Sequence, residues 1–126
     1  MATRASGAGS FTRPVTAAAI VRHRLLTMNA QGEVSHAGAS DPVVGVSESN
    51  VPAEADGRPQ GDAVGVASLN TDGLMQFEAS GAIAVGAILG KAADGRVSGG
   101  GGLGWMNMTA GITTAGDNLT AVPVVP

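Results

Sequence analysis

The sequence has 126 residues with 20 Gly, two Phe, one Trp and no Tyr, which suits a single domain with a thin core, because small side chains bury little apolar area. The absence of Cys excludes a disulfide scaffold, thiolate chemistry and a zinc–thiolate site. The formal net charge of −3 is unevenly spread, since residues 1–32 hold four Arg and no acid and the remainder is acidic.

Targeting segments are not evident in the sequence. No run approaches roughly 18 consecutive apolar residues, so we expect no transmembrane helix and no membrane partner. The first residues lack the apolar stretch of a secretory signal, and the Cys-free composition is compatible with synthesis in a reducing cytoplasm.

Residues 1–14 are small and polar around one aromatic residue, Phe11, and they show no periodicity. We expect an extended, flexible arm without a fold of its own in the free monomer. A basic start on an acidic body suggests docking on an acidic surface. The arginines concerned are Arg4, Arg13, Arg22 and Arg24. The alternatives are a solvated arm with incidental charge and a Phe11 that closes one end of its own domain.

Residues 15–28 mix helix-favouring Ala with β-branched residues. We predict a strand with a bend near residues 22–24, because this stretch matches a later segment that contains Gly. His23 lies between two arginines, which favours its neutral form, and we interpret it as a surface residue.

Short elements follow in the next part of the chain. A turn over residues 29–32 precedes predicted strands at residues 33–37 and 42–47. Residues 48–61 are polar and contain two Pro, which predicts a loop long enough for contacts with a partner. Its three acids lack the spacing of a calcium loop, so we expect plain solvation and no metal site.

Residues 62–69 and 74–79 are predicted strands joined by a turn at residues 70–73. Residues 79–98 predict a hairpin, because Asp94 and Gly95 tolerate positive φ between two apolar runs.

The end of the chain begins with the Gly-rich segment 99–104, which we expect to be a flexible tip or linker. Trp105 opens the next short segment, and predicted strands follow at residues 111–114 and 119–125. Pro123 has no N–H to donate, so the last strand should lie at a sheet edge or stop pairing there.

The hairpin has a counterpart earlier in the chain. Residues 19–35 align without a gap with residues 82–98, at a constant offset of 63. The identical pairs are Ala19/Ala82, Ile20/Ile83, Leu26/Leu89, Ala30/Ala93, Gly32/Gly95, Val34/Val97 and Ser35/Ser98. Seven identities in 17 positions exceed chance for this composition and indicate a duplicated β-unit. Accidental matching in a chain rich in Ala, Gly and Val is the alternative.

About eight short strands separated by Gly, Asp and Asn turns predict an all-β fold, either a sandwich or a small β-barrel. We therefore divide the chain into an arm, residues 1–14, and a single β-domain, residues 15–126.

Recognisable catalytic patterns are missing from the sequence. His23 and His36 are the only histidine bases, and neither lies in a known motif. The glycine run at residues 99–102 lacks the Lys-Ser/Thr pair of a phosphate-binding loop. Four arginines without interleaved aromatic residues are weak support for a nucleic-acid partner. We expect no enzyme, no cofactor, no metal and no direct nucleic-acid contact.

Several segments resemble the capsid cement, or decoration, proteins of tailed bacteriophages. They are Gly61–Ala67, Asp72-Gly73, Ala79–Leu89 and Ala92–Val97, together with Val43–Ser47 and Gly111–Leu119. The resemblance spans about residues 15–125, and its motifs are patterns of Gly, Ala and Val. The sequence departs from the family at the loop 48–61, at the glycine run and at Trp105.

The resemblance implies a small β-barrel or β-tulip-like domain on the exterior of an icosahedral capsid, made in the host cytoplasm. It implies a homotrimer at or near threefold positions, bridging and stabilising subunits of the major capsid protein. We expect partner contacts from Arg4, Phe11, Arg13, Arg22, Arg24 and Trp105. Deletion of residues 2–13 is expected to weaken capsid binding while the β-body stays folded.

Two other functions are consistent with the sequence. One is a host- or glycan-binding module on a virion surface, although few aromatic residues are available as a sugar platform. The other is a small structural protein of a tail or baseplate, which composition does not distinguish from a cement protein.

Overall fold

The computed structural model describes residues 9–70 and 73–124. These residues form ten strands and two single-turn 3-10 helices, which confirms the predicted all-β class. The elements are β1 (Ser10–Pro14), β2 (Leu25–Met28), β3 (Val34–His36), β4 (Gly45–Ser47), η1 (Glu54–Asp56), β5 (Ala63–Ala67), β6 (Met75–Glu78), β7 (Gly90–Lys91), η2 (Ala93–Gly95), β8 (Val97–Ser98), β9 (Trp105–Asn107) and β10 (Asn118–Pro123).

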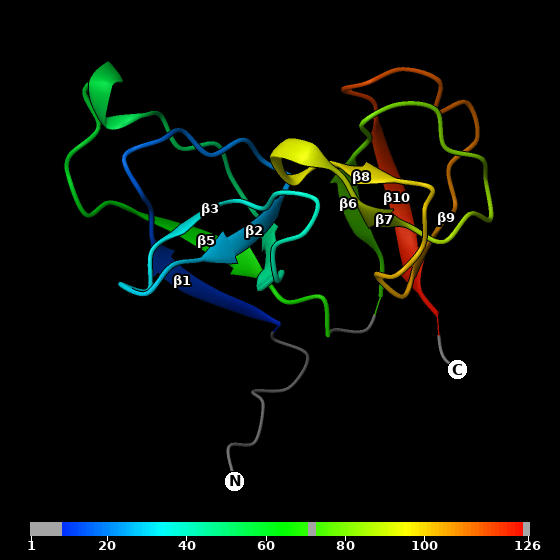
Figure 1. Cartoon of the computed structure of the whole chain (residues 1–126), viewed down its shortest axis with the longest axis horizontal. Helices are drawn as coiled ribbons and strands as arrows, with labels where there is room; N and C mark the ends of the chain where they lie inside the picture. The colour runs from blue at the N-terminus through cyan, green and yellow to red at the C-terminus, as the bar shows by residue number, and fades with distance from the viewer. Residues whose placement is uncertain (1–8, 71–72, 125–126) are drawn as a thin grey trace, which may run out of the picture.

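Figure 1 shows two β-units side by side along the long axis of the molecule. The N-terminal unit, residues 10–69, holds a sheet of order β1-β5-β4-β2-β3. The C-terminal unit, residues 74–124, holds the sheets β6-β10-β9 and β7-β8, and an antiparallel bridge between Ile88 and Met106 joins them. The second order is therefore β6-β10-β9-β7-β8, which repeats the first strand by strand.

Backbone contacts outside the ladders repeat in the same way. Val15 and Val34 form a parallel bridge in the N-terminal unit, as Ala79 and Val97 do in the C-terminal unit. The antiparallel bridge of Ile20 with Val51 has its counterpart in Ile83 with Ile112. Backbone pairing therefore confirms the predicted duplication, because accidental matches of Ala, Gly and Val in the sequence would not repeat the same backbone contacts.

The offset between equivalent residues changes along the unit because the loops differ in length. The N–H of Val15 donates to Asp62 O at 3.0 Å, and the N–H of Ala79 donates to Asp117 O at 2.8 Å. The offset is therefore 64 between Val15 and Ala79, but only 55 between Asp62 and Asp117. For β4 and β9 the offset is 60, because Val46 pairs with Leu25 as Met106 pairs with Ile88.

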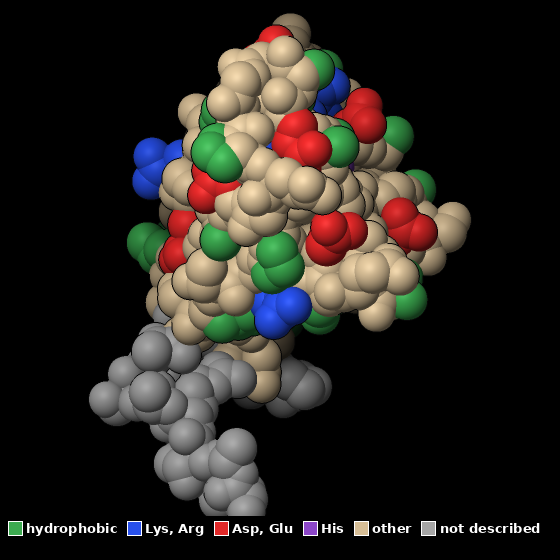
Figure 2. All heavy atoms as spheres, turned by 90° about the vertical axis from the view of Figure 1, so that its left-hand side faces the viewer, with side chains coloured by type: hydrophobic (Ala, Val, Ile, Leu, Met, Phe, Trp, Pro, Cys, Tyr) green, Lys and Arg blue, Asp and Glu red, His purple; other side chains and the backbone are tan. Residues whose placement is uncertain are grey.

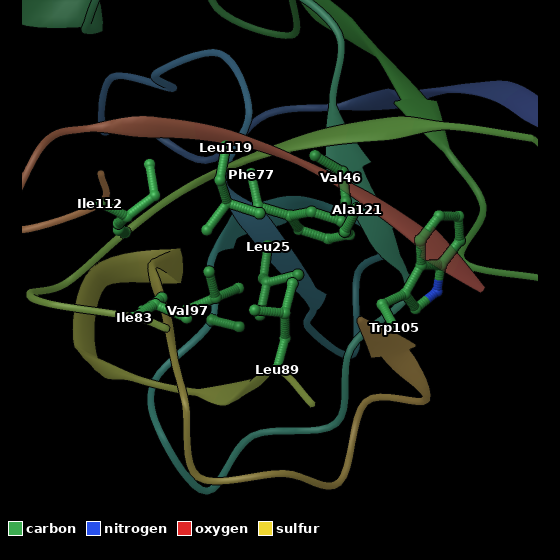
Figure 3. Close-up of a cluster of buried hydrophobic side chains, with 12 residues drawn as sticks. Leu25, Val46, Phe77, Ile83, Leu89, Val97, Trp105, Ile112, Leu119 and Ala121 are labelled. Atoms are coloured by element: carbon green, nitrogen blue, oxygen red, sulfur yellow. The ribbon is translucent and has the colours of Figure 1, made fainter. Parts of the chain in front are cut away.

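The two units share one of their two cores. Val15, Ile20 and five further apolar residues form a small cluster within the N-terminal unit. The larger cluster belongs mainly to the C-terminal unit, but Leu25 and Val46 of the N-terminal unit lie among its side chains (Figure 3). Burial of these shared side chains stabilises the junction as well as each unit.

Residues 10–14, which were predicted to belong to an N-terminal arm, form a strand instead. Ser10–Pro14 forms β1 and pairs with β5 along its whole length, from Ser10 opposite Ala67 to Pro14 opposite Ala63. The boundary at residue 14 was wrong because the partner strand lies about 50 residues away in sequence, where no local pattern indicates it. Residues 1–8, including Arg4, lie outside the described residues.

Other boundaries also differ from expectation. Residues 15–24 form no strand, only isolated bridges at Val15 and Ile20, and β2 begins at Leu25, after the predicted bend. The expected strand at residues 111–114 is a single bridge at Ile112. Of the expected turn 70–73, residues 71–72 lie outside the described residues, as does the end of the last strand at residue 125.

The sheets curl without closing. The N-terminal sheet bends until Val15 meets Val34, but a single bridge joins the two ends, so the described strands make no closed barrel. The predicted hairpin is present as β7 and β8, and Asp94 and Gly95 between them have φ of 58° and 74°. β10 is central in its sheet and not at an edge, and its ladder with β9 ends at the pair of Pro123 with Trp105.

No helix among residues 9–70 and 73–124 is long and apolar enough to cross a bilayer.

Candidate binding surface

Glu78 lies at the junction of the two units and binds arginines from both. Its Oε2 accepts a hydrogen bond from Arg24 Nη2 of the N-terminal unit at 2.9 Å. The same oxygen accepts one from Arg96 Nε of the C-terminal unit at 2.5 Å. The Glu78 backbone N–H also donates to His23 O at 3.0 Å. One acidic residue at the end of β6 therefore ties the units together.

The surroundings of Glu78 favour its ionised form. Burial alone would raise the pKa of its carboxyl, but the hydrogen bonds and charges of Arg24 and Arg96 outweigh this and hold the pKa below its ordinary value. Both arginines are only partly exposed, so solvent screens the cluster less than it would a surface pair.

A shallow hollow of about 340 Å³ lies beside this junction. On one side it is lined by Arg22, His23 and residues of β4, and on the other by Leu74, Met75 and Gln76. Leu74 is 63% exposed at its rim. The hollow is open and mixes polar and apolar groups, which suits contact with another protein surface better than enclosure of a small ligand.

The two histidines do not form a catalytic arrangement with each other. Burial, and then the nearby charge of Arg22, lowers the pKa of His23. Burial, and then the charge of Arg24, lowers the pKa of His36, whose Nε2 accepts the Val21 N–H at 2.9 Å. Both rings are therefore neutral at pH 7, and His36 supports the backbone before β2. Within the part of the chain that the structure describes, no three His, Cys, Asp or Glu residues gather where they could hold a metal ion.

A solved structure has a similar fold. The fold of this chain is similar to that of the head fiber gp8.5 N base in bacteriophage phi29. The TM-score is 0.66 at 22% sequence identity, over 90% of this chain and 92% of that chain. The likeness therefore extends over both units, and at this identity it shows the fold alone. No protein-family model and no curated protein matches the sequence.

The residues expected to contact a partner do not form one patch. Arg13 donates through Nε and Nη2 to Gly32 O at 3.0 and 2.8 Å, which ties β1 to the turn after β2. Arg24 lies in the Glu78 cluster, and Arg22 is exposed at the hollow. Phe11 is 38% exposed on β1. Of these residues, Arg22 and Phe11 present substantial side-chain surface outward.

Trp105 is not a surface residue, so its expected role in partner contact was wrong. Its side chain is 1% exposed, and its Nε1 donates to Leu69 O at 3.2 Å. Its ring lies 5.6 Å from that of Phe77, in an edge-to-face arrangement at 65° (Figure 3). Trp105 buries a large apolar area at the junction, which few other side chains of this chain could do.

Sequence reasoning missed Arg58, a buried basic residue in the loop 48–61. Its Nη2 donates to Thr16 O at 2.5 Å and lies 3.3 Å from Glu54 Oε2. Arg58 therefore fixes this loop against the segment after β1, which makes the loop part of the N-terminal unit. The only sequence signal was the spacing of Glu54 and Arg58, four residues apart.

One outer face of the N-terminal unit is visible in Figure 2. Acidic side chains are dispersed over it, with separate hydrophobic side chains between them and few basic ones. This face carries no concentrated basic patch that would indicate a nucleic-acid partner.

Proposed function

We propose that this protein is a structural protein of a phage head, which binds the outer surface of the assembled capsid and bridges subunits of the major capsid protein. The observation that carries the proposal is the fold shared over nearly the whole length of both chains with a head fiber base. The sequence resemblance to capsid cement proteins supports the same location independently.

The architecture suits a passive structural role. A protein that binds only the assembled lattice stabilises that lattice by linkage, and it needs no active site to do so. Two fused β-units with a shared core provide a rigid body, and repeated contacts around a symmetry axis add avidity. The ring of His36 accepts the Val21 N–H through Nε2, so this histidine has a structural role in the N-terminal unit.

The alternatives differ in how well the structure supports them. A glycan-binding module would need exposed aromatic rings, but Trp105 and Phe77 are buried, and Phe11 alone is exposed. A base for a projecting appendage is a second candidate, because the matched structure is described as the base of a head fiber.

Co-sedimentation tests the proposed location. The purified chain would be mixed with phage heads that lack it and, separately, with isolated tails, and the pelleted fraction would be measured at increasing concentration. We expect saturable binding to heads and none to tails. Binding to tails alone would support the tail or baseplate alternative instead, and binding to neither would remove the proposal.

A further inference from the structure

The junction inside the chain provides a template for a contact between chains. Within one molecule, β6 and η2 of the C-terminal unit pack on the N-terminal unit. Met75 lines the hollow opposite Arg22 and His23, and the Gly95 N–H donates to Ala37 O at 2.7 Å. Because the units are duplicated, the C-terminal unit has a surface equivalent to the one that β6 covers.

That equivalent surface is open and apolar. Val85 occupies the place of Arg22 and is 61% exposed, and Met108 occupies the place of Glu48 and is 50% exposed. Ala87 takes the place of Arg24. Three charged residues of the inner junction are thus replaced by apolar residues on the outer surface.

The N-terminal unit provides the matching partner. Phe11 of β1 pairs with Val66 of β5, and Met75 of β6 pairs with Ala121 of β10. Val66 and Ala121 differ by the offset of 55 found above, so Phe11 is the equivalent of Met75. Phe11 is 38% exposed. Pro14 takes the place of Glu78, so both members of the Arg24–Glu78 ion pair have apolar equivalents on these two outer surfaces.

A second exposed residue fits the same scheme. Met28 is the equivalent of Lys91, whose Nζ donates to Asp41 O across the inner junction at 2.7 Å. Met28 is 40% exposed and is the last residue of β2, next to the turn that corresponds to η2. Four of the six large hydrophobic side chains exposed among the described residues therefore lie at positions equivalent to the inner junction: Phe11, Met28, Val85 and Met108.

The change from charged to apolar has a physical reason. The two units of one chain are covalently linked, so their junction needs little intrinsic affinity. A contact between separate chains must also overcome the loss of translational and rotational freedom, which requires burial of apolar area. Pro14 has no N–H with which to repeat the Glu78–His23 hydrogen bond, so the outer contact depends still more on apolar packing.

We propose that the surface around Val85 and Met108 binds β1 and Met28 of a second copy of this chain, in the arrangement that joins the two units within each chain. The loop before β7 and the turn after β2 lie at opposite ends of the long axis, so the contact is head to tail (Figure 1). Such a contact forms a ring if its rotation closes. A ring of the expected trimer would contain six β-units. This inference depends on the duplication and not on binding to a phage head.

Sedimentation equilibrium of the full chain tests the contact. We expect the wild-type protein to self-associate, and the double variant Val85→Glu/Met108→Glu to weaken this association by more than about tenfold, because it places charge in an apolar contact. The matched control is Ala55→Glu/Gln60→Glu, which adds the same two charges at exposed positions of the loop 48–61, outside both proposed faces. This control should keep the wild-type mass. A monomeric wild type, or an unchanged double variant, would overturn the proposal.

Mixing experiments distinguish a head-to-tail contact from a symmetric one. Phe11→Glu should impair one face, and Val85→Glu/Met108→Glu should impair the other, so each variant alone should be monomeric. An equimolar mixture should form a heterodimer through the two intact faces and grow no further. A mixture that stays monomeric would overturn the head-to-tail arrangement.

Crosslinking provides a test that does not require charged variants. The chain has no Cys, so Phe11→Cys and Met106→Cys introduce unique thiols. Met106 is the equivalent of Val46, which lines the inner hollow together with Met75. A short thiol-reactive crosslinker should join a chain carrying one substitution to a chain carrying the other. Crosslinking no greater than that of a Ser49→Cys control would contradict the proposal. Circular dichroism would establish that each variant is folded.

Discussion

His23 and Gly86 hold the same position in the two units, and both have left-handed backbone, with φ of 68° and 85°. Each donates its N–H to the equivalent carbonyl, Ser47 O at 3.0 Å and Asn107 O at 2.7 Å. The bend is therefore a property of the repeated fold, which Gly adopts without strain and His adopts at a cost.

This relationship predicts opposite effects of two substitutions. Gly86→Ala should lower the free energy of unfolding by about 1 kcal/mol, because a Cβ at positive φ is strained even though no atom lies within 4 Å of it. His23→Gly should raise it by up to about 1 kcal/mol. Urea unfolding followed by Trp fluorescence measures both. A stabilising Gly86→Ala would show that the bend does not carry this cost.

Glu78→Gln should destabilise the protein by about 2 kcal/mol, because it leaves Arg24 and Arg96 partly buried without a counter-charge. Glu48→Gln is the matched control, since Glu48 is exposed and should change stability by less than about 0.5 kcal/mol. Chemical denaturation at pH 7 compares the two. Equal effects would mean that the cluster contributes nothing beyond a surface acid.

Acidification should destabilise the protein in two steps. The pKa values of His23 and His36 are lowered in the fold, so the unfolded state binds more protons below pH 6.5, the ordinary value, and the free energy of unfolding falls as pH drops below it. The pKa of Glu78 is also lowered, so its contribution is present above 4.5 and is lost as pH falls through the folded value. Asp117 also loses its contribution to stability in the lower pH range, because hydrogen bonds from the backbones of Thr114 and Thr113 lower its pKa.

Two substitutions separate these steps. His36→Gln keeps an acceptor for the Val21 N–H and should reduce the upper step, while Glu78→Gln should reduce the lower one. Unfolding titrations from pH 8 to pH 3 measure both. Stability that rises on acidification from pH 7 to pH 5 would contradict the assigned directions.

Truncations at the N-terminus should now differ according to where they stop. Deletion of residues 2–8 should weaken head binding, because it removes Arg4 from the basic start of the chain. Deletion of residues 2–13 should also lower the melting temperature, because it removes β1 from β5 and exposes Val64 and Val66. Co-sedimentation and thermal unfolding distinguish the two effects. Unchanged stability after the longer deletion would show that β1 is dispensable.

Trp105→Ala should cost about 3–5 kcal/mol, because it empties a fully buried position at the shared core. In the wild type, Trp105 fluorescence should not be quenched by acrylamide until the protein unfolds, and partner binding should change it little. Strong quenching in the native state would place this side chain at the surface instead.

Local patterns predicted part of this fold. The hairpin at Asp94 and Gly95 was predictable because both residues must have positive φ there. The duplication was predictable because Gly32 and Gly95, with φ of 78° and 74°, occupy equivalent turns that limit sequence change. β1 was missed because its stability comes from Val64 and Val66, far away in sequence.

The candidate surface was harder to predict for the same reason. Glu78 is an ordinary polar residue of a strand until the fold places Arg24 and Arg96 beside it. Trp105 is buried because the fold packs its ring against Phe77, a contact that no local sequence pattern indicates. The exposed Val85 and Met108 indicate a contact surface only when they are compared with Arg22 and Glu48, their equivalents in the N-terminal unit.

The most direct test of the central claim is an electron cryo-microscopy reconstruction of particles purified from cultures that carry the gene. The account predicts density for this fold on the outer surface of the head, in contact with major capsid subunits. Density confined to the tail, or particles that lack the chain altogether, would contradict it.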